Sequence, residues 1–191
     1  MPHSKPSPRP SFLKRVWAVL LQDMTLEKEA AAAGRRRVIA VVDGGAVAKH
    51  TTLWALTHVA GKGDILTLLR IIPPPSSSSS RREDEAHLLA NSLASLCRAC
   101  CPEVEVEALV IRGPKLATVL SQVKKLEAYV LVLSQAKPSP FSCLMRSGTE
   151  DFVEQCIEKA QCMAMAVRKQ SRGVGGYLVS TRWKKNFWLL A

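Results

Sequence analysis

The chain has 191 residues, of which 47% are hydrophobic, a length and composition typical of one globular domain with extensions. Its longest apolar runs, such as VWAVLL and AYVLVL, fall far short of the roughly 20 residues of a membrane-spanning helix, so no transmembrane segment is predicted. The net charge of +11 resides at the two ends, because residues 1–37 hold eight basic and three acidic side chains and residues 168–191 hold six basic and none acidic. An acidic partner is therefore expected to meet a basic terminus rather than the central region.

Residues 1–36 are interpreted as a basic N-terminal extension. The first ten residues include four prolines and predict a partly disordered arm. Residues 11–33 predict a basic amphipathic helix, since apolar residues recur at helical spacing around Lys14 and Arg15; they are Phe12, Val16, Val19 and Leu20. This helix either packs on the protein itself, touches a membrane surface or serves as a transit segment. The acidic residues Asp23, Glu27 and Glu29 argue against organelle targeting.

Strands and helices alternate strictly from residue 37 to residue 169. Five apolar runs predict buried strands, at residues 38–43, 64–72, 104–111, 128–134 and 162–169. Helical spacing marks the intervening segments, which are residues 46–60, 83–101, the segment that Gly113-Pro114 opens, and about 150–160. The proline- and serine-rich residues 73–80 are expected to be disordered. The alternation predicts a three-layer α/β/α, Rossmann-like fold with a five-stranded parallel sheet.

Ligands of such open sheets bind beyond the carboxyl ends of the strands, where the strand order reverses. This rule directs attention to Asp43, Ile71, Gly113 and the loop after Ser134.

The six cysteines lack the spacing of a disulfide framework, and the chain opens without a secretory signal; they are Cys97, Cys100, Cys101, Cys143, Cys156 and Cys162. We therefore expect a reducing compartment, the cytosol or the nucleus. Cys97 and Cys100 form a C-x-x-C pair, but the remaining cysteines do not supply the second close pair of a zinc site. Cys97 and Cys100 are interpreted as part of the apolar face of a helix.

Residues 170–191 are interpreted as a basic aromatic C-terminal tail. It interleaves Trp183, Phe187 and Trp188 with basic residues, a mixture that also suits single-stranded nucleic acid; the basic residues are Arg182, Lys184 and Lys185. Because aromatic side chains dominate burial energetics, we favour packing on the protein's own fold or in a dimer over a partner or membrane contact, and nucleic acid last.

Four short segments between residues 37 and 169 carry a family likeness. They are VIAVVD followed by LWAL, LTLLRII before a proline, Arg112-Gly113-Pro114 at the start of the third helix, and LVLS at the end of the fourth strand. On these segments the chain resembles the universal stress protein family of the adenine-nucleotide alpha-hydrolase-like superfamily. The closing GGYLVSTRWKKNFWLLA is similar to the tail of a land-plant branch. The resemblance implies the universal stress protein fold, a role in stress response and, as often in that family, a homodimer.

In nucleotide-binding members of that family, the loop after the fourth strand carries glycine, two residues, glycine, nine residues, then glycine with serine or threonine. Here Ser134, Lys137 and Ser147 stand at the glycine positions, with Gly148 at the hydroxyl position. Glycine accepts positive φ and lets backbone amides approach phosphate oxygens closely, so the loop is interpreted as degenerate. Some capacity to bind phosphate remains. It lies in the charge of Lys137, the hydroxyls of Ser147 and Thr149, and the backbone amides around Gly148 at the start of a helix.

The resemblance also implies roles for two residues on the first and second strands. Asp43 matches the acidic residue that contacts the adenosine part of the ligand, and Ile71 matches a residue that flanks the adenine. ATP or AMP would be that ligand. Asp43 is equally well explained as a turn residue that caps the following helix.

Catalytic and metal chemistry have little support in the sequence. His50, His58 and His87 lie on separate helical stretches or faces without a ligand partner at the right spacing, and are interpreted as surface or boundary residues. A serine framed as a nucleophile elbow is missing around Gly113 and Gly148. Three functions stay open: a non-catalytic stress-response module, an ATP-binding switch with weak hydrolysis, and an adaptor that docks acidic partners through its basic ends.

Overall fold

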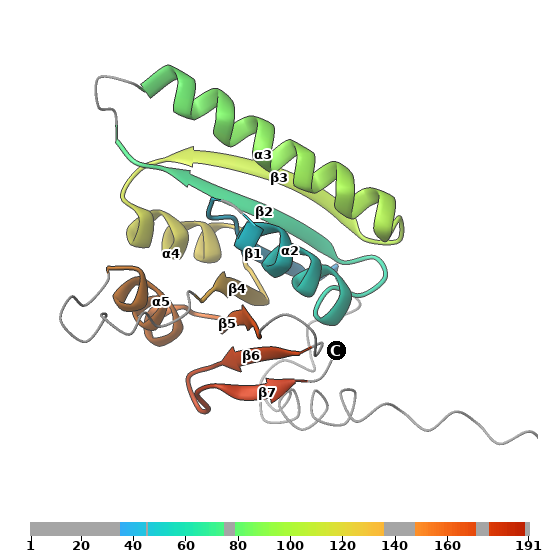
Figure 1. Ribbon diagram of the computed structural model, residues 1–191, viewed down its shortest axis with the longest axis vertical. Coiled ribbons are helices and arrows are strands. Elements are labelled where there is room, and N and C mark those ends of the chain that lie inside the picture. Colours follow the sequence, from blue (N-terminus) through green and yellow to red (C-terminus); the bar gives the residue numbers. More distant parts are fainter. Residues whose placement is uncertain (1–34, 45, 75–78, 136–147, 171–175, 190–191) are drawn as a thin grey trace, which may run out of the picture. The chain divides into compact units, whose positions relative to one another are not determined.

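A seven-stranded sheet forms the centre of the computed structural model, in the order β3-β2-β1-β4-β5-β6-β7 (Figure 1). Five strands are parallel: β1 Arg37–Val41, β2 Ile65–Ile72, β3 Glu105–Arg112, β4 Val130–Ser134 and β5 Met163–Lys169. Each of them coincides with a predicted run, so the Rossmann-like α/β fold is confirmed. The strands β6 Tyr177–Ser180 and β7 Phe187–Leu189 continue the sheet in antiparallel pairing.

The structure describes residues 35–44, 46–74, 79–135, 148–170 and 176–189. The predicted N-terminal arm and amphipathic helix lie outside these residues, as do the phosphate-loop positions Lys137 and Ser147. Residues 35–191 form one compact unit.

Within the described ranges four helices cover the sheet: α2 Ala46–His58, α3 Ser79–Cys100, α4 Lys115–Lys125 and α5 Gly148–Lys159. Contacts join α2 to α3 and α4 to α5, which gives one helical layer on each face. Strand side chains alternate between the faces, and one core cluster unites Ile39, Leu69 and Leu131 with residues of α4 and α5. In the described part of the chain, none of the helices combines the length and apolarity needed to cross a membrane.

Two expectations about the loops and the sheet need correction. The predicted disordered loop at residues 73–80 is too long, because α3 already begins at Ser79. The sheet also exceeds the five predicted parallel strands, since β6 and β7 form within the segment interpreted as a tail. These strands are only four and three residues long, and their sequence lacks the long apolar run that would predict a buried strand.

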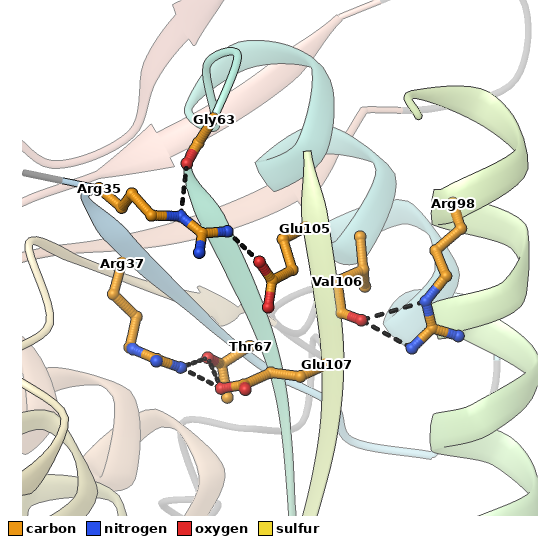
Figure 2. A network of polar contacts seen from close by, with 8 residues as sticks. All are labelled: Arg35, Arg37, Gly63, Thr67, Arg98, Glu105, Val106 and Glu107. Atoms are coloured by element: carbon orange, nitrogen blue, oxygen red, sulfur yellow. Dashed lines mark hydrogen bonds and ion pairs between the residues drawn. The ribbon is translucent and has the colours of Figure 1, made fainter. Parts of the chain in front are cut away.

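An ion-pair network fixes the amino ends of the first three strands (Figure 2). Arg35 pairs with Glu105 and also donates a hydrogen bond to the carbonyl oxygen of Gly63, at 3.3 Å. Arg37 pairs with Glu107, and both contact the buried Thr67 hydroxyl, at 2.8 and 2.6 Å. Polar contacts thus link β1, β2 and β3 at the end of the sheet opposite the expected ligand edge.

A second set of contacts holds the hairpin of β6 and β7 to the domain. The ring centroid of Tyr177 lies 6.4 Å from that of Trp54 and 6.3 Å from that of His58, so β6 packs against α2. On the other side, Lys185 pairs with Glu154 of α5 at 2.8 Å. The hairpin is therefore attached to both helical layers.

Candidate functional site

The strand order reverses between β1 and β4. The chain leaves β1 to form β2 and β3 on one side, then returns to form β4 and β5 on the other. In sheets of this class the crevice beyond the carboxyl ends of two such strands is the usual ligand position. Asp43 follows β1 at this edge, and Ser134 ends β4.

An ion pair between Asp43 and Lys115 dominates this edge. The Lys115 Nζ lies 2.7 Å from the Asp43 Oδ1, and the two side chains are 35% and 33% exposed. The same Nζ lies 4.2 Å from the ring centroid of Phe152 on α5, a cation–π contact. The Asp43 carboxylate is therefore neutralised by a lysine of its own chain that is itself held in place.

The turn before α4 positions Lys115. The Gly113 amide donates to the Ile72 carbonyl oxygen at 2.9 Å, and Pro114 precedes the helix with extended backbone angles. A Cβ atom at Gly113 would lie only 2.5 Å from the Thr118 Oγ1. Glycine is needed here for this close approach, so the turn that delivers Lys115 to Asp43 depends on it.

Ile71 and Cys156 lie in the packed core below the ion pair. Ile71 is 8% exposed and belongs to the same core cluster as Phe152 and Cys156. Burial raises the pKa of Cys156 to about 12; the charge of Lys115 lowers this pKa and the charge of Asp43 raises it, both by less than burial does. This thiol stays protonated at neutral pH and contributes packing rather than a nucleophile.

Ser134 directs its hydroxyl into the fold. Its Oγ donates to the Oγ1 of the buried Thr51 on α2, at 3.0 Å. The backbone amide of the next residue, Gln135, donates to the Val167 carbonyl oxygen at 2.9 Å. The side-chain Oε1 of Gln135 accepts from the Ser180 hydroxyl at 3.5 Å. The first of the three glycine positions is thus occupied by a side chain engaged with α2.

The predicted site residues divide into two groups. Asp43, Ile71 and Ser134 come to the carboxyl ends of β1, β2 and β4, while Gly148 and Thr149 begin α5. Lys137 and Ser147 lie outside the described residues. Lys115 was missed by the sequence analysis, although a cation one residue after Gly113-Pro114, at the same sheet edge as Asp43, was a usable signal.

Several other sequence expectations have a definite outcome. His50 and His58 are partly exposed and His87 is exposed, which confirms them as surface or boundary residues. Cys97 is buried as predicted, with a pKa that burial raises to about 11, but Cys100 is exposed, so the apolar face of α3 does not include it. Trp183 is 65% exposed, so this residue does not pack on the protein's own fold, and its packing in a dimer stays a prediction.

Comparison with known proteins identifies a family model, described as the universal stress protein family, that matches residues 34–168. A universal stress protein from Archaeoglobus fulgidus matches 70% of this chain and 93% of its own, with 16% identity and a TM-score of 0.56. A family protein from Arabidopsis thaliana solved with AMP bound matches 71% and 93%, with 16% identity and a TM-score of 0.51.

A universal stress protein in complex with cAMP matches 70% of this chain and 97% of its own, with 14% identity and a TM-score of 0.53. At these identities the likeness concerns the fold. A search of curated proteins gives no significant match.

Proposed function

Since the match over residues 34–168 shows that this chain belongs to the universal stress protein family, we propose that it is a non-catalytic regulatory module of stress response with a weakened adenine-nucleotide site. The family supplies the stress-response role. The site at the carboxyl ends of β1 and β4 supplies the reason for weakened binding.

The ion pair between Asp43 and Lys115 carries this proposal. For the Asp43 carboxylate to accept hydrogen bonds from ribose hydroxyls, it would have to share or give up a lysine partner 2.7 Å away. Because both side chains are about one-third exposed, the pair itself is worth no more than about 1 kcal/mol. The ion pair therefore lowers nucleotide affinity by a few fold and does not abolish it alone.

The substituted glycine positions add to this effect. Ser134, Lys137 and Ser147 all carry a Cβ atom where a phosphate-binding loop profits from glycine. The hydroxyl of Ser134 is also engaged with Thr51. A weakened adenosine contact and a weakened phosphate contact act on the same ligand, so their effects on affinity multiply.

Isothermal titration with Mg-ATP and with AMP tests the proposal. The wild-type chain is expected to give no saturable heat at micromolar nucleotide, and Lys115→Met is expected to gain affinity because it frees Asp43. Lys124→Met, at the other end of α4, is the control for charge. Micromolar binding by the wild type that Asp43→Ala abolishes would contradict the proposal.

That contradicting outcome would favour the second candidate, an ATP-binding switch with weak hydrolysis. Its support is the position of Gly148 and Thr149 at the start of the 12-residue helix α5, where backbone amides favour an anion. The structures solved with AMP and cAMP show that this fold accepts such ligands in other proteins.

We also propose where the protein works and how it assembles. The five cysteines in the described part of the chain are free thiols, which supports the reducing cytosol or nucleus.

Family membership supports a homodimer, which light scattering would detect, and the closing segment supports the land-plant branch. Docking of an acidic partner through the basic ends stays a further candidate, supported by the six basic and no acidic side chains in residues 168–191.

A further inference from the structure

Three cysteines lie at the carboxyl end of α3, away from the nucleotide crevice. Cys97 and Cys100 belong to the helix, and Cys101 follows it, with its amide donating to the Cys97 carbonyl oxygen at 2.9 Å. Residues three and four positions apart lie on the same side of a helix, so the three side chains are neighbours. All three are free thiols, and we call them the thiol cluster.

The thiol cluster extends from the interior of the protein to its surface. Cys97 is buried, Cys101 is partly exposed and Cys100 is exposed. Because α3 packs on β2 and β3, the buried Cys97 lies on the side of the helix that faces the sheet. A reagent in solution therefore reaches Cys100 first.

Helix geometry places Cys97 and Cys100 within the range of a disulfide. Cα atoms three positions apart in an α-helix are separated by about 5 Å, inside the range of roughly 4.4–6.8 Å that disulfides span. The adjacent Cys100 and Cys101 have Cα atoms about 3.8 Å apart, which is below that range. Cys101 is also near Cys97, but it is less exposed than Cys100, and its carbonyl oxygen accepts from the Val104 amide at 3.2 Å.

The electrostatics of the thiol cluster agree with this closeness. The pKa of Cys97 is raised to about 11, first by burial and then by the neighbouring Cys100 and Cys101 thiols. Arg98 lowers the same pKa, but its guanidinium donates to the Val106 carbonyl oxygen of β3, at 3.1 and 2.6 Å (Figure 2). Cys97 therefore stays protonated at neutral pH and is suited to be the second partner in an exchange rather than the first nucleophile.

Oxidation suits this arrangement better than metal binding. Among the residues that the structure describes, no group of three His, Cys, Asp or Glu side chains is arranged to hold a metal ion. We propose that Cys97 and Cys100 form a reversible disulfide by exchange with a low-molecular-weight disulfide such as glutathione disulfide. This bond closes across the last turn of α3, where Cβ atoms about 5–6 Å apart must approach to about 3.8 Å.

The disulfide forms in two exchange steps. The Cys100 thiolate attacks one sulfur of glutathione disulfide, which gives a mixed disulfide and releases one glutathione thiolate. The Cys97 thiolate then attacks the Cys100 sulfur and releases the second glutathione thiolate. Two protein thiols are oxidised, one glutathione disulfide is reduced to two thiols, and the two protons of the protein thiols pass to the released glutathione.

The strain of this disulfide determines when it exists. A strained disulfide is more easily reduced, so the thiols stay reduced in a reducing compartment and the bond forms when that compartment becomes oxidising. Closing it also disturbs the turn that holds the Cys101 amide on the Cys97 carbonyl oxygen and Arg98 on Val106. Oxidation therefore loosens the carboxyl end of α3 from β3, and hydrogen exchange at Cys101 should accelerate in the oxidised protein.

The test is peptide mapping of the full chain after incubation with glutathione disulfide, acid quenching and blocking of the remaining thiols. Trypsin cleaves after Arg98, between the two cysteines, so the proposed disulfide holds two tryptic peptides together. We expect these bridged peptides in the wild type, and their loss in Cys100→Ser or after excess reduced glutathione. In Cys97→Ala one glutathione is expected to remain on Cys100, because the second step lacks its nucleophile.

Two control variants assign the bond. Cys101→Ser is expected to keep the bridged peptides at the wild-type level, and so is Cys162→Ser, which removes a partly exposed thiol just before β5. Bridged peptides that survive in Cys100→Ser would assign the bond to Cys101 and overturn the proposal. Glutathione that stays on wild-type Cys100 without a bridge, or no reaction at all, would overturn it as well. Melting temperatures of the reduced variants check folding, and the exposed position of Cys100 keeps Cys100→Ser informative if Cys97→Ala fails to fold.

Discussion

The guanidinium of Arg182 donates two hydrogen bonds to the carbonyl oxygen of Ile157, from Nε at 3.3 Å and from Nη2 at 3.2 Å. The same side chain also contacts the carbonyl oxygens of Glu158 and Ala160. The last carbonyl groups of a helix have no partner within the helix, and a cation there also interacts favourably with the helix dipole. Arg182, in the turn between β6 and β7, therefore closes the carboxyl end of α5.

Replacing this arginine is expected to loosen the hairpin. Arg182→Met keeps most of the apolar stem but loses the donors, so we expect a loss of about 1–2 kcal/mol in the free energy of unfolding by urea. Arg182→Lys keeps the charge but lacks the planar guanidinium, so its free energy of unfolding should lie between those of the wild type and Arg182→Met. Hydrogen exchange at Val179 and Ser180 should accelerate in Arg182→Met. Unchanged exchange at these two residues would mean that the other contacts hold the hairpin in place without Arg182.

The cysteines are expected to differ sharply in reactivity. Burial raises the pKa of Cys97 to about 11 and that of Cys156 to about 12, so at pH 8 only about one in a thousand Cys97 side chains, and fewer for Cys156, is a thiolate. Cys100 is exposed. Mass spectrometry after brief treatment with a thiol reagent should find Cys100 modified well before Cys97 or Cys156. Denaturant should remove the difference, and early labelling of Cys156 in the native protein would contradict it.

The turn that positions Lys115 provides a test of close packing. Gly113→Ala would place a Cβ atom 2.5 Å from the Thr118 Oγ1, so we expect a loss of about 1–2 kcal/mol in thermal or urea unfolding. Thr118→Ala removes the hydroxyl and should restore most of that loss in the double variant. If the two losses simply add, the turn relieves the clash by a route other than Thr118.

Protonation of His58 is expected to destabilise the protein in mild acid. Its ring stacks on Trp54 with 5.2 Å between centroids, and burial lowers its pKa below the ordinary value of 6.5. A lowered folded-state pKa contributes stability that is present above pH 6.5 and is lost as the pH falls through the folded value. His58→Phe keeps a stacked ring and should show a smaller loss of melting temperature between pH 7 and pH 5. The exposed His87→Gln should behave like the wild type.

The parallel half of the fold was predictable because its strands are buried on both faces. The segment at residues 38–43 is continuously apolar, and β1 is almost wholly buried. The antiparallel half was not predictable from periodicity, since β6 and β7 depend on pairing with β5 and on contacts such as that of Arg182 with α5. The exposure of Trp183 was not predictable for the same reason, because the pairing places this residue in the turn between β6 and β7.

The position of the candidate site was predictable from the sequence, but the ion pair between Asp43 and Lys115 was not. The end of a buried strand located Asp43, but its partner lies 72 positions later in the chain and two strands away in the sheet. The strands β1 and β3 lie roughly 10 Å apart, and the side chains of Lys115 and Asp43 bridge this separation together. Spacing in the sequence does not encode such a pair, whereas the parallel order of the strands does.

The outermost strand β7 also bears on how copies of this chain associate. An exposed strand edge offers unpaired amide and carbonyl groups to another chain, and a short edge offers few of them. At the β7 side of the sheet the strand is three residues long, while β3 at the opposite side is eight. At β3, Arg98 of α3 already donates to the Val106 carbonyl oxygen, at 3.1 and 2.6 Å. The hairpin of β6 and β7 in turn covers the longer strand β5, so at its side of the sheet only a short edge remains for pairing with another chain.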